Sequence, residues 1–272
     1  MSFTLTFTHL YPDRLNLYGD GGNLIALQRR CEWHGIECCL RELNWGDRAL
    51  PGQTDLYFMG GGQDADQLAV VDDFHTRKRD AVQTDTQAGV VFLGVCGGYQ
   101  LMGNTFLMGN GDQTRGLGIL NAETKAPSTE VTARCIGNLI AELLPPIGDQ
   151  LSEIYDPPRS VPKTLVGFEN HSGQTHLGPG VMPLARTLSG FGNNAEATYE
   201  GARFKNVFGS YMHGSLLPKN PHFADYLLWL ALVQKYNDPS IRLKALPDQE
   251  EWAAHAYFIQ RYGKAKALEP SS

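Results

Sequence analysis

The residue with the clearest chemical potential is a cysteine set among glycines, in Gly94-Val95-Cys96-Gly97-Gly98. A continuous apolar run precedes it, and a helix-like stretch begins directly after it. A tight turn between a strand and a helix strains the backbone and leaves no room for neighbouring side chains, so glycines are expected beside the central residue. The N-terminus of a helix favours a thiolate and offers N–H groups to an oxyanion. We interpret Cys96 as a nucleophile; the alternative is a buried structural cysteine in a glycine-rich turn.

A thiol nucleophile needs a base, and the chain has eight histidines. His213 follows the strand-like run 206–211, where the C-terminal edge of a parallel sheet would bring it close to Cys96. His171 also follows a strand-like run, 163–168. A single histidine is more often structural than catalytic, so Cys96 is the main reason to choose His213 as the base.

Glycines also follow an earlier apolar segment, because Gly60-Gly61-Gly62 come directly after residues 55–59. Without side chains, such residues allow backbone N–H groups to approach a ligand closely. Gly61 or Gly62, together with Gly97, could therefore form an oxyanion hole. A plain turn explains the three glycines equally well.

The elements that must position these residues alternate in type over the first 105 residues. Strands that alternate with helices predict βαβ units and a parallel sheet. The fold class we expect is α/β, with a doubly wound, mostly parallel sheet flanked by helices, appended strands and C-terminal helices. We expect strands at 4–9, 36–43, 55–59, 88–95, 116–120, 130–136, 163–168 and 206–211, and helices after 23, over 64–84 and from 97. The apolar residues expected to face the core from the first two helices are Leu24, Ile25, Leu27, Cys31, Leu68, Val71, Phe74 and Val82.

The C-terminal third contains two amphipathic helix-like segments, 220–236 and 248–262. Residues 145–162 hold five of the 15 prolines and are the best candidate for a long loop. We expect one domain over 1–240, and a C-terminal helix and tail, 241–272, that packs on it.

Composition excludes several classes. The 272 residues carry 23 Lys+Arg and 29 Asp+Glu, a net charge of −6, with no basic block of a nucleic-acid-binding protein. No apolar stretch is long enough to span a membrane, and the N-terminus does not resemble a signal peptide. Five cysteines in a chain of this size favour the reducing cytoplasm. Cys31, His34, Cys38 and Cys39 lie close together but lack the paired spacing of a zinc site, so we expect no metal.

The order of glycine-rich loop, cysteine turn and late histidine resembles the class I, triad-type glutamine amidotransferases. Within them, Gly-Val-Cys-Gly-Gly-Tyr-Gln and Gly-Ser-Tyr-Met-His-Gly are similar to the CobB/CobQ-like branch. Three longer motifs, over 15–23, 166–173 and 213–221, resemble the GatD family, the glutaminase subunits of lipid II isoglutaminyl synthase. The resemblance covers roughly residues 4–230.

The resemblance implies roles for individual residues. Cys96 would form a thioester with the side chain of L-glutamine, and His213 would protonate the leaving ammonia and then activate water. Arg134 lies where the family uses an arginine to bind glutamine, and a guanidinium suits an α-carboxylate. A solvated arginine is the alternative. Gln100, Asn170 and His171 are further candidates for substrate contact.

One departure from the superfamily pattern concerns the third member of the triad. Most triad amidotransferases have His-Pro-Glu, whereas this chain has His213-Gly214-Ser215 and so lacks the acid two residues after the histidine. A histidine without an orienting acid is a poorer base. The GatD resemblance implies that a partner subunit supplies an aspartate, and Glu169 is the alternative within the chain.

The resemblance also implies partners. The chain would pass ammonia to a Mur-ligase-like synthetase subunit, MurT-like, in a heterodimer, which would amidate the D-glutamate of lipid II. Because this chain has no phosphate loop, ATP and Mg²⁺ would belong to that subunit. Three alternatives remain: a cobyric-acid-type amidotransferase subunit, a stand-alone cysteine hydrolase of γ-glutamyl bonds, and a catalytically silent binding subunit.

Overall fold

The computed structural model describes residues 2–107, 111, 113–126, 134–194, 196, 198–213 and 216–263. Its largest sheet has six strands in the order β13-β14-β4-β3-β1-β2. Every neighbouring pair is parallel except β13 and β14, which are antiparallel. The strands are β1 (Thr4–Leu10), β2 (Glu37–Leu43), β3 (Leu56–Met59), β4 (Val91–Val95), β13 (Ala202–Phe204) and β14 (Val207–Ser210).

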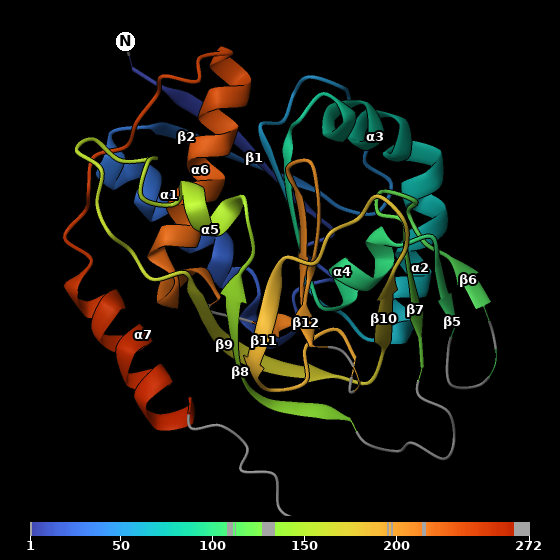
Figure 1. The fold of residues 1–272 in the computed structure, drawn as a ribbon. Coiled ribbons are helices and arrows are strands. Elements are labelled where there is room, and N and C mark those ends of the chain that lie inside the picture. The colour runs from blue at the N-terminus through green and yellow to red at the C-terminus, as the bar shows by residue number, and fades with distance from the viewer. Residues whose placement is uncertain are drawn as a thin grey trace, which may run out of the picture.

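Helices cover both faces of this sheet (Figure 1). In that view α1 (Gly22–His34) and α6 (Pro221–Tyr236) lie against each other on the left. On the right lie α2 (Asp64–Arg77), α3 (Arg79–Gln87) and α4 (Gly97–Met102). Residues of β3 and β4 are all buried, as expected for central strands of a parallel sheet covered on both faces. The predicted doubly wound α/β fold is confirmed.

Two smaller sheets carry the appended strands, in the orders β10-β7-β5-β6 and β12-β11-β8-β9-β15. The chain leaves β14 in the large sheet and enters β15 in the third sheet after a single residue, so His213 lies where the two sheets meet. The strands are β5 (Thr105–Leu107), β6 (Gln113–Arg115), β7 (Ala122–Lys125), β8 (Cys135–Leu143), β9 (Thr164–His171), β10 (Gln174–Leu177), β11 (Ala185–Ser189), β12 (Tyr199–Glu200) and β15 (Met212–His213). The remaining helices are η1 (Leu17–Gly19), α5 (Ile147–Gln150), η2 (Leu217–Lys219) and α7 (Gln249–Tyr262).

Several sequence predictions differ from the structure. The single helix expected over 64–84 is two helices, because the chain turns at Lys78, whose ammonium reaches back to the carboxylate of Asp73. The segment 116–120 is not a strand, and the strand expected over 130–136 falls partly outside the described residues. Ile25 and Leu68, expected to face the core, are exposed. The division at residue 240 stays a prediction.

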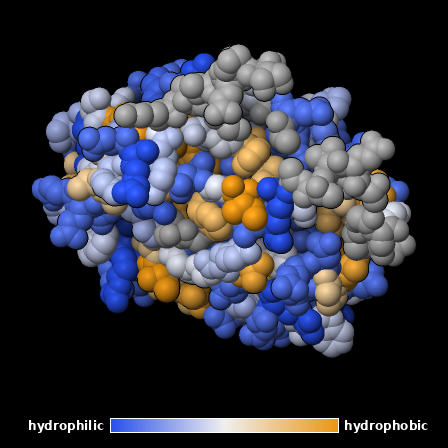
Figure 2. Space-filling view, turned by 90° about the horizontal axis from the view of Figure 1, so that it is seen from below, coloured by the Kyte–Doolittle hydropathy of each residue, from blue (hydrophilic) through white to orange (hydrophobic). Residues whose placement is uncertain are grey.

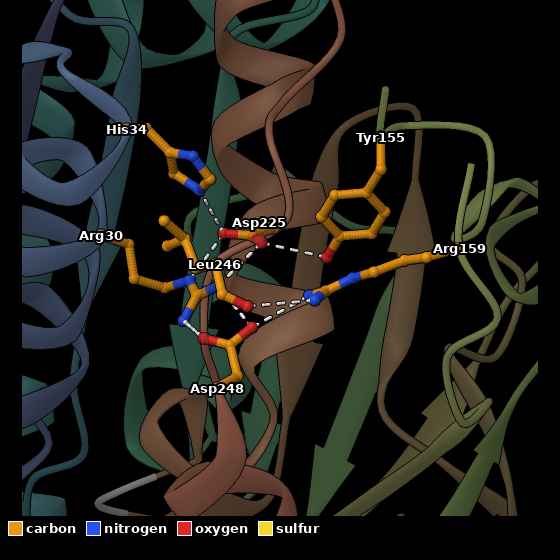
Figure 3. A network of polar contacts seen from close by, with 7 residues as sticks. All are labelled: Arg30, His34, Tyr155, Arg159, Asp225, Leu246 and Asp248. Atoms are coloured by element: carbon orange, nitrogen blue, oxygen red, sulfur yellow. Dashed lines mark hydrogen bonds and ion pairs between the residues drawn. The ribbon is translucent and has the colours of Figure 1, made fainter. Parts of the chain in front are cut away.

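A buried ionic network joins α1, α6 and the segment before α7 (Figure 3). The guanidinium of Arg30 donates two hydrogen bonds to Asp225, of 2.6 and 2.8 Å, and two to Asp248, of 2.8 and 3.2 Å. Burial alone would raise the pKa of Asp225, but its bonds with His34 and Arg30 outweigh that and lower the pKa to about 2. The outer members of the network are Tyr155, Arg159 and the Leu246 carbonyl.

The surface seen from below is mainly hydrophilic, with separate apolar patches (Figure 2). Among the described residues, none of the helices has the length and the apolar character needed to span a membrane.

Candidate active site

Cys96 occupies the turn between β4 and α4 with φ +48° and ψ −107°. Such a conformation is rare for a residue with a side chain and costs about 1–3 kcal/mol. Two hydrogen bonds of 2.8 Å hold it: its N–H donates to Ser210 O, and its carbonyl accepts from the Gln100 N–H. A Cβ on Gly98 would lie 2.4 Å from Met59 O, so the turn packs directly against the end of β3. The structure thus has the strained turn that the glycine pattern predicts.

Three side chains converge on Gly61. A Cβ placed on that glycine would lie 3.0 Å from Asp20 Oδ2, 3.1 Å from His213 Cε1 and 3.3 Å from Cys96 Cβ. The cysteine, the histidine and an aspartate therefore surround one small residue, although they come from three distant parts of the chain. Absence of a side chain at residue 61 is what lets them approach each other.

His213 and Asp20 are both fully buried, and Nδ1 of the imidazole lies 3.4 Å from Oδ1 of the carboxylate. Burial alone would lower the pKa of His213, but the contacts with Asp20 and Cys96 outweigh it and raise this pKa to about 10. Its Nε2 has no hydrogen-bond partner among the described residues. The imidazole thus lies between the Asp20 carboxylate and Cys96, the arrangement of a triad with a thiol nucleophile.

The acid beside His213 within this chain is Asp20, which the sequence analysis did not select, rather than Glu169. An aspartate from a partner subunit stays a prediction. Asp20 lies 193 residues before the histidine, so the two-residue spacing of the His-Pro-Glu pattern could not reveal it. Glu169 faces elsewhere: its two carboxylate oxygens accept hydrogen bonds from Phe191 N and Gly192 N, at 2.7 and 3.0 Å.

The loop that carries Asp20 is fixed on both sides. Asn16 Oδ1 accepts from Gly21 N at 2.7 Å, and Asn23 Nδ2 donates to Asp20 O at 3.0 Å. Asn23 Oδ1 in turn accepts from Leu217 N at 3.0 Å. Asn23 therefore links the start of α1 to the segment that follows His213, which keeps the two halves of the triad in register.

Of the three glycines predicted to donate N–H groups to an oxyanion, Gly61 already uses its N–H within the protein. The N–H of Gly61 donates to Asp20 Oδ2 at 2.8 Å and is thereby committed. A Cβ on Gly97 would lie 2.8 Å from the backbone nitrogen of Gly62, so these two residues lie side by side next to Cys96. Gly62 and Gly97 are therefore the adjacent glycines left for the oxyanion role, which stays a prediction.

A cavity of about 440 Å³ opens above Cys96. Such a volume is sufficient for a small metabolite. Six of the residues selected from the sequence line it together: Gly62, Cys96, Gln100, Arg134, Asn170 and His171. His213, Gly61 and Gly97 lie outside its lining.

The residues predicted to contact the substrate differ in whether their polar groups already form hydrogen bonds within the protein. Arg134 is exposed at the cavity and forms no hydrogen bond or ion pair with another described residue. The Gln100 amide is committed at both ends, since Oε1 accepts from Gln67 Nε2 at 3.1 Å and Nε2 donates to the Tyr211 hydroxyl at 3.3 Å. The His171 ring stacks on Tyr211 with centroids 3.6 Å apart.

Two residues of the cavity were missed. Gln67 is buried, and its Oε1 has no hydrogen-bond partner among the described residues. Tyr18 has a left-handed φ of +56° and places its ring 4.7 Å from the His213 ring, and its hydroxyl accepts from Asn170 Nδ2 at 2.8 Å. A polar side chain on the core-facing side of α2 was a usable signal for Gln67. The usable signal for Tyr18 was its place in the motif over 15–23 that resembles GatD.

A larger cavity, of about 580 Å³, lies at Thr6, Arg41 and Asp85 and has no histidine in its lining. No group of three or more metal-ligating side chains occurs in the described ranges of the chain.

Comparison with known proteins identifies the family. Residues 6–221 match the model of the CobB/CobQ-like glutamine amidotransferase domain. The chain is 32% identical to the GatD subunit of the glutamine-hydrolysing lipid II isoglutaminyl synthase of Staphylococcus aureus, over 96% of this chain and 98% of that one. It is 34% identical to the same subunit of Streptococcus pneumoniae, over 90% and 87%. The structure of PurLQS from Thermotoga maritima shares the fold, with a TM-score of 0.53 at 14% identity, covering 87% of this chain and 99% of that chain. This chain thus belongs to the CobB/CobQ-like glutamine amidotransferases, in their GatD branch.

Proposed function

We propose that this chain is the glutaminase subunit of a lipid II isoglutaminyl synthase. Its matches to GatD subunits extend over nearly the whole of both chains, which favours this role over a cobyric-acid-type subunit. The observation that carries the glutaminase chemistry is the convergence of Cys96, His213 and Asp20 on Gly61, directly under the cavity that Arg134 lines.

In the proposed reaction the Cys96 thiol passes its proton to His213, and the sulfur attacks the side-chain amide carbon of L-glutamine. The N–H groups of Gly62 and Gly97 stabilise the oxyanion. The C–N bond then breaks, the nitrogen takes the proton of His213, and ammonia leaves a glutamyl thioester. His213 next removes a proton from water, which attacks the thioester and releases glutamate and the thiol. Asp20 orients the imidazole through both half-reactions.

The ammonia would pass to a Mur-ligase-like subunit, which would use ATP and Mg²⁺ to activate the α-carboxyl of D-glutamate in lipid II. Support for a separate synthetase comes from the sequence, which has no phosphate loop at Gly19–Asn23 or elsewhere. We propose a cytoplasmic location as well, because the five cysteines are free and favour a reducing compartment.

One observation favours a second candidate. Because Asp20 completes a triad inside this chain, the isolated subunit has every group that a stand-alone γ-glutamyl hydrolase needs. This candidate predicts full activity without a partner, whereas the amidotransferase proposal predicts a gain on complex formation.

The test is ammonia release from L-glutamine by the purified chain, alone and with its Mur-ligase-like subunit, followed by mass spectrometry of lipid II. Amidated lipid II that depends on both subunits, and is lost in Cys96→Ala, is the expected result. Equal ammonia release in the two samples with no amidation would support the hydrolase. Absence of ammonia release in both would reject glutaminase chemistry.

A further inference from the structure

Two opposite charges line the cavity above Cys96. Asp64 begins α2 and is exposed, and Arg134 precedes β8 and is exposed as well. In the described part of the chain, neither side chain forms a hydrogen bond or an ion pair. Exposed charges are commonly solvated, so the distinguishing feature of these two is their position: opposite charges at one cavity suit a ligand that carries both signs.

The cavity has a buried end and an exposed end. Cys96 is 7% exposed and Gln100 5%, so the end of the cavity where the reaction occurs is enclosed. Asp64 and Arg134 are at its exposed part. A substrate amide at the enclosed end would therefore leave the opposite end of an amino acid, with its ammonium and carboxylate, among the two free charges.

We propose that the carboxylate of Asp64 binds the α-ammonium group of the substrate and restricts the cavity to free amino acids. This inference rests on the proposed glutaminase function. Arg134 supplies the complementary contact to the α-carboxylate. Asp64 is the one carboxylate among the described residues that line the cavity. A substrate without an α-ammonium group would leave the Asp64 carboxylate unpaired and close to the α-carboxylate of the substrate, which is unfavourable.

The alternative is that Asp64 serves α2 alone. Acidic residues in the first turn of a helix interact favourably with its dipole, and α2 has two of them, Asp64 and Asp66. Asp66 differs in its surroundings: its Oδ1 lies 3.9 Å from Arg14 Nη1, and it does not line the cavity. Asp66 therefore provides a matched control, since it has the same charge on the same helical turn.

The experiment compares two amides as substrates of Asp64→Asn and Asp66→Asn, each in the complex with the synthetase subunit. L-Glutamine carries the α-ammonium, and glutaramate has the same amide and carboxylate without it. For Asp64→Asn we expect KM for L-glutamine to rise about 10–100-fold, with kcat within about threefold and kcat/KM for glutaramate within about twofold. Asp66→Asn should keep the wild-type ratio of the two substrates.

If Asp64→Asn lowered kcat/KM equally for L-glutamine and glutaramate, the ratio of the two values would be unchanged. That result would overturn the role of Asp64 and leave the glutaminase function intact. If the wild-type complex released ammonia from neither substrate, the proposed function would fail, and this inference with it. Melting temperatures of both variants within a few degrees of the wild type identify any loss as a binding effect.

Discussion

The candidate catalytic cluster (Cys96, His213 and Asp20) and the ionic network around Arg30 are both buried groups of polar residues, yet they differ in how completely their hydrogen bonds are made. In the network, each guanidinium nitrogen of Arg30 donates to a carboxylate, and of its side chains only Arg159 has an unpartnered atom among the described residues, Nε. Around the candidate active site, four buried side-chain atoms of the described residues lack a hydrogen-bond partner: His213 Nε2, Gln67 Oε1, Asn170 Oδ1 and His171 Nε2.

Buried polar atoms without partners are costly, and they persist where a ligand completes them. The network is closed and holds helices in place, whereas the cluster is open on the side that faces the cavity. Helix α1 connects the two, because Asp20 lies two residues before it and Arg30 lies within it. Comparison of the two regions therefore predicts that changes in the cluster affect the rate, and changes in the network affect stability.

The largest effect is expected for Asp20→Asn. The amide would keep the shape of the side chain but would not stabilise the imidazolium of His213, so kcat should fall about 10²–10⁴-fold. The melting temperature should change little. Glutaminase assays of the complex measure the first quantity and thermal unfolding the second.

Asp13→Asn is the control, because Asp13 is exposed in the same loop and should leave kcat unchanged. Glu169→Gln tests the alternative acid, and it should leave kcat close to the wild-type value if Asp20 orients His213. If Asp20→Asn retained wild-type kcat, the acid would have to come from elsewhere, and a partner aspartate would regain support.

Arg30→Met should have the opposite profile. Removing the guanidinium leaves Asp225 and Asp248 buried without their main partner, so the free energy of unfolding should decrease by about 3–5 kcal/mol. Urea denaturation measures this change. Per folded molecule, kcat should stay within a few-fold of the wild type.

Arg29→Met is the adjacent control. Arg29 pairs with Glu32 on the surface, where both side chains are more than half exposed, and an exposed pair contributes only about 0–1 kcal/mol. Similar destabilisation by both substitutions would contradict a special role for the network.

Gly61→Ala tests how tightly the cluster is packed. Its new methyl group would lie 3.0–3.3 Å from Asp20, His213 and Cys96, closer than most real contacts, so the triad must shift. We expect a loss of about 10–100-fold in kcat with a smaller change in stability. Kinetics of the complex provide the measurement, and Gly22→Ala, where no atom lies within 4 Å, should be silent.

The smallest effect concerns the dependence of stability on pH. Burial raises the pKa of Glu200 from 4.5 to about 7, against hydrogen bonds from Ser210 and Tyr211 that lower it. The folded state therefore binds this proton more tightly than the unfolded state. The stabilisation is complete below pH 4.5 and is lost as pH rises through 7.

Glu200→Gln should remove this loss, on the order of 1 kcal/mol, and flatten the melting temperature between pH 5 and 8. Glu123→Gln, at an exposed position, should keep the wild-type slope. A slope that is identical in Glu200→Gln and the wild type would show that other groups cause it.

The fold and two members of the proposed triad, Cys96 and His213, could be predicted from the sequence because they depend on local patterns. Apolar strands followed by glycines predicted β3 and β4, and the glycines around Cys96 predicted its strained turn. The predictions failed where a long-range contact decides. Helix α2 ends before Lys78, whose buried ammonium donates to the Asp47 carbonyl, 31 residues away. Ile25 and Leu68 lie on helix positions that the apolar pattern assigned to the core but that the packing leaves exposed.

By itself, the sequence determined the α/β class and selected Cys96 and His213 as candidates, since strand and helix periodicity and glycine spacing are properties of short segments. Only the tertiary structure decided which acid faces His213, which glycine N–H is committed to it, and that Asp64 and Arg134 share one cavity. Those relations join residues up to 193 positions apart. They depend on how sheets and loops pack, which no local pattern encodes.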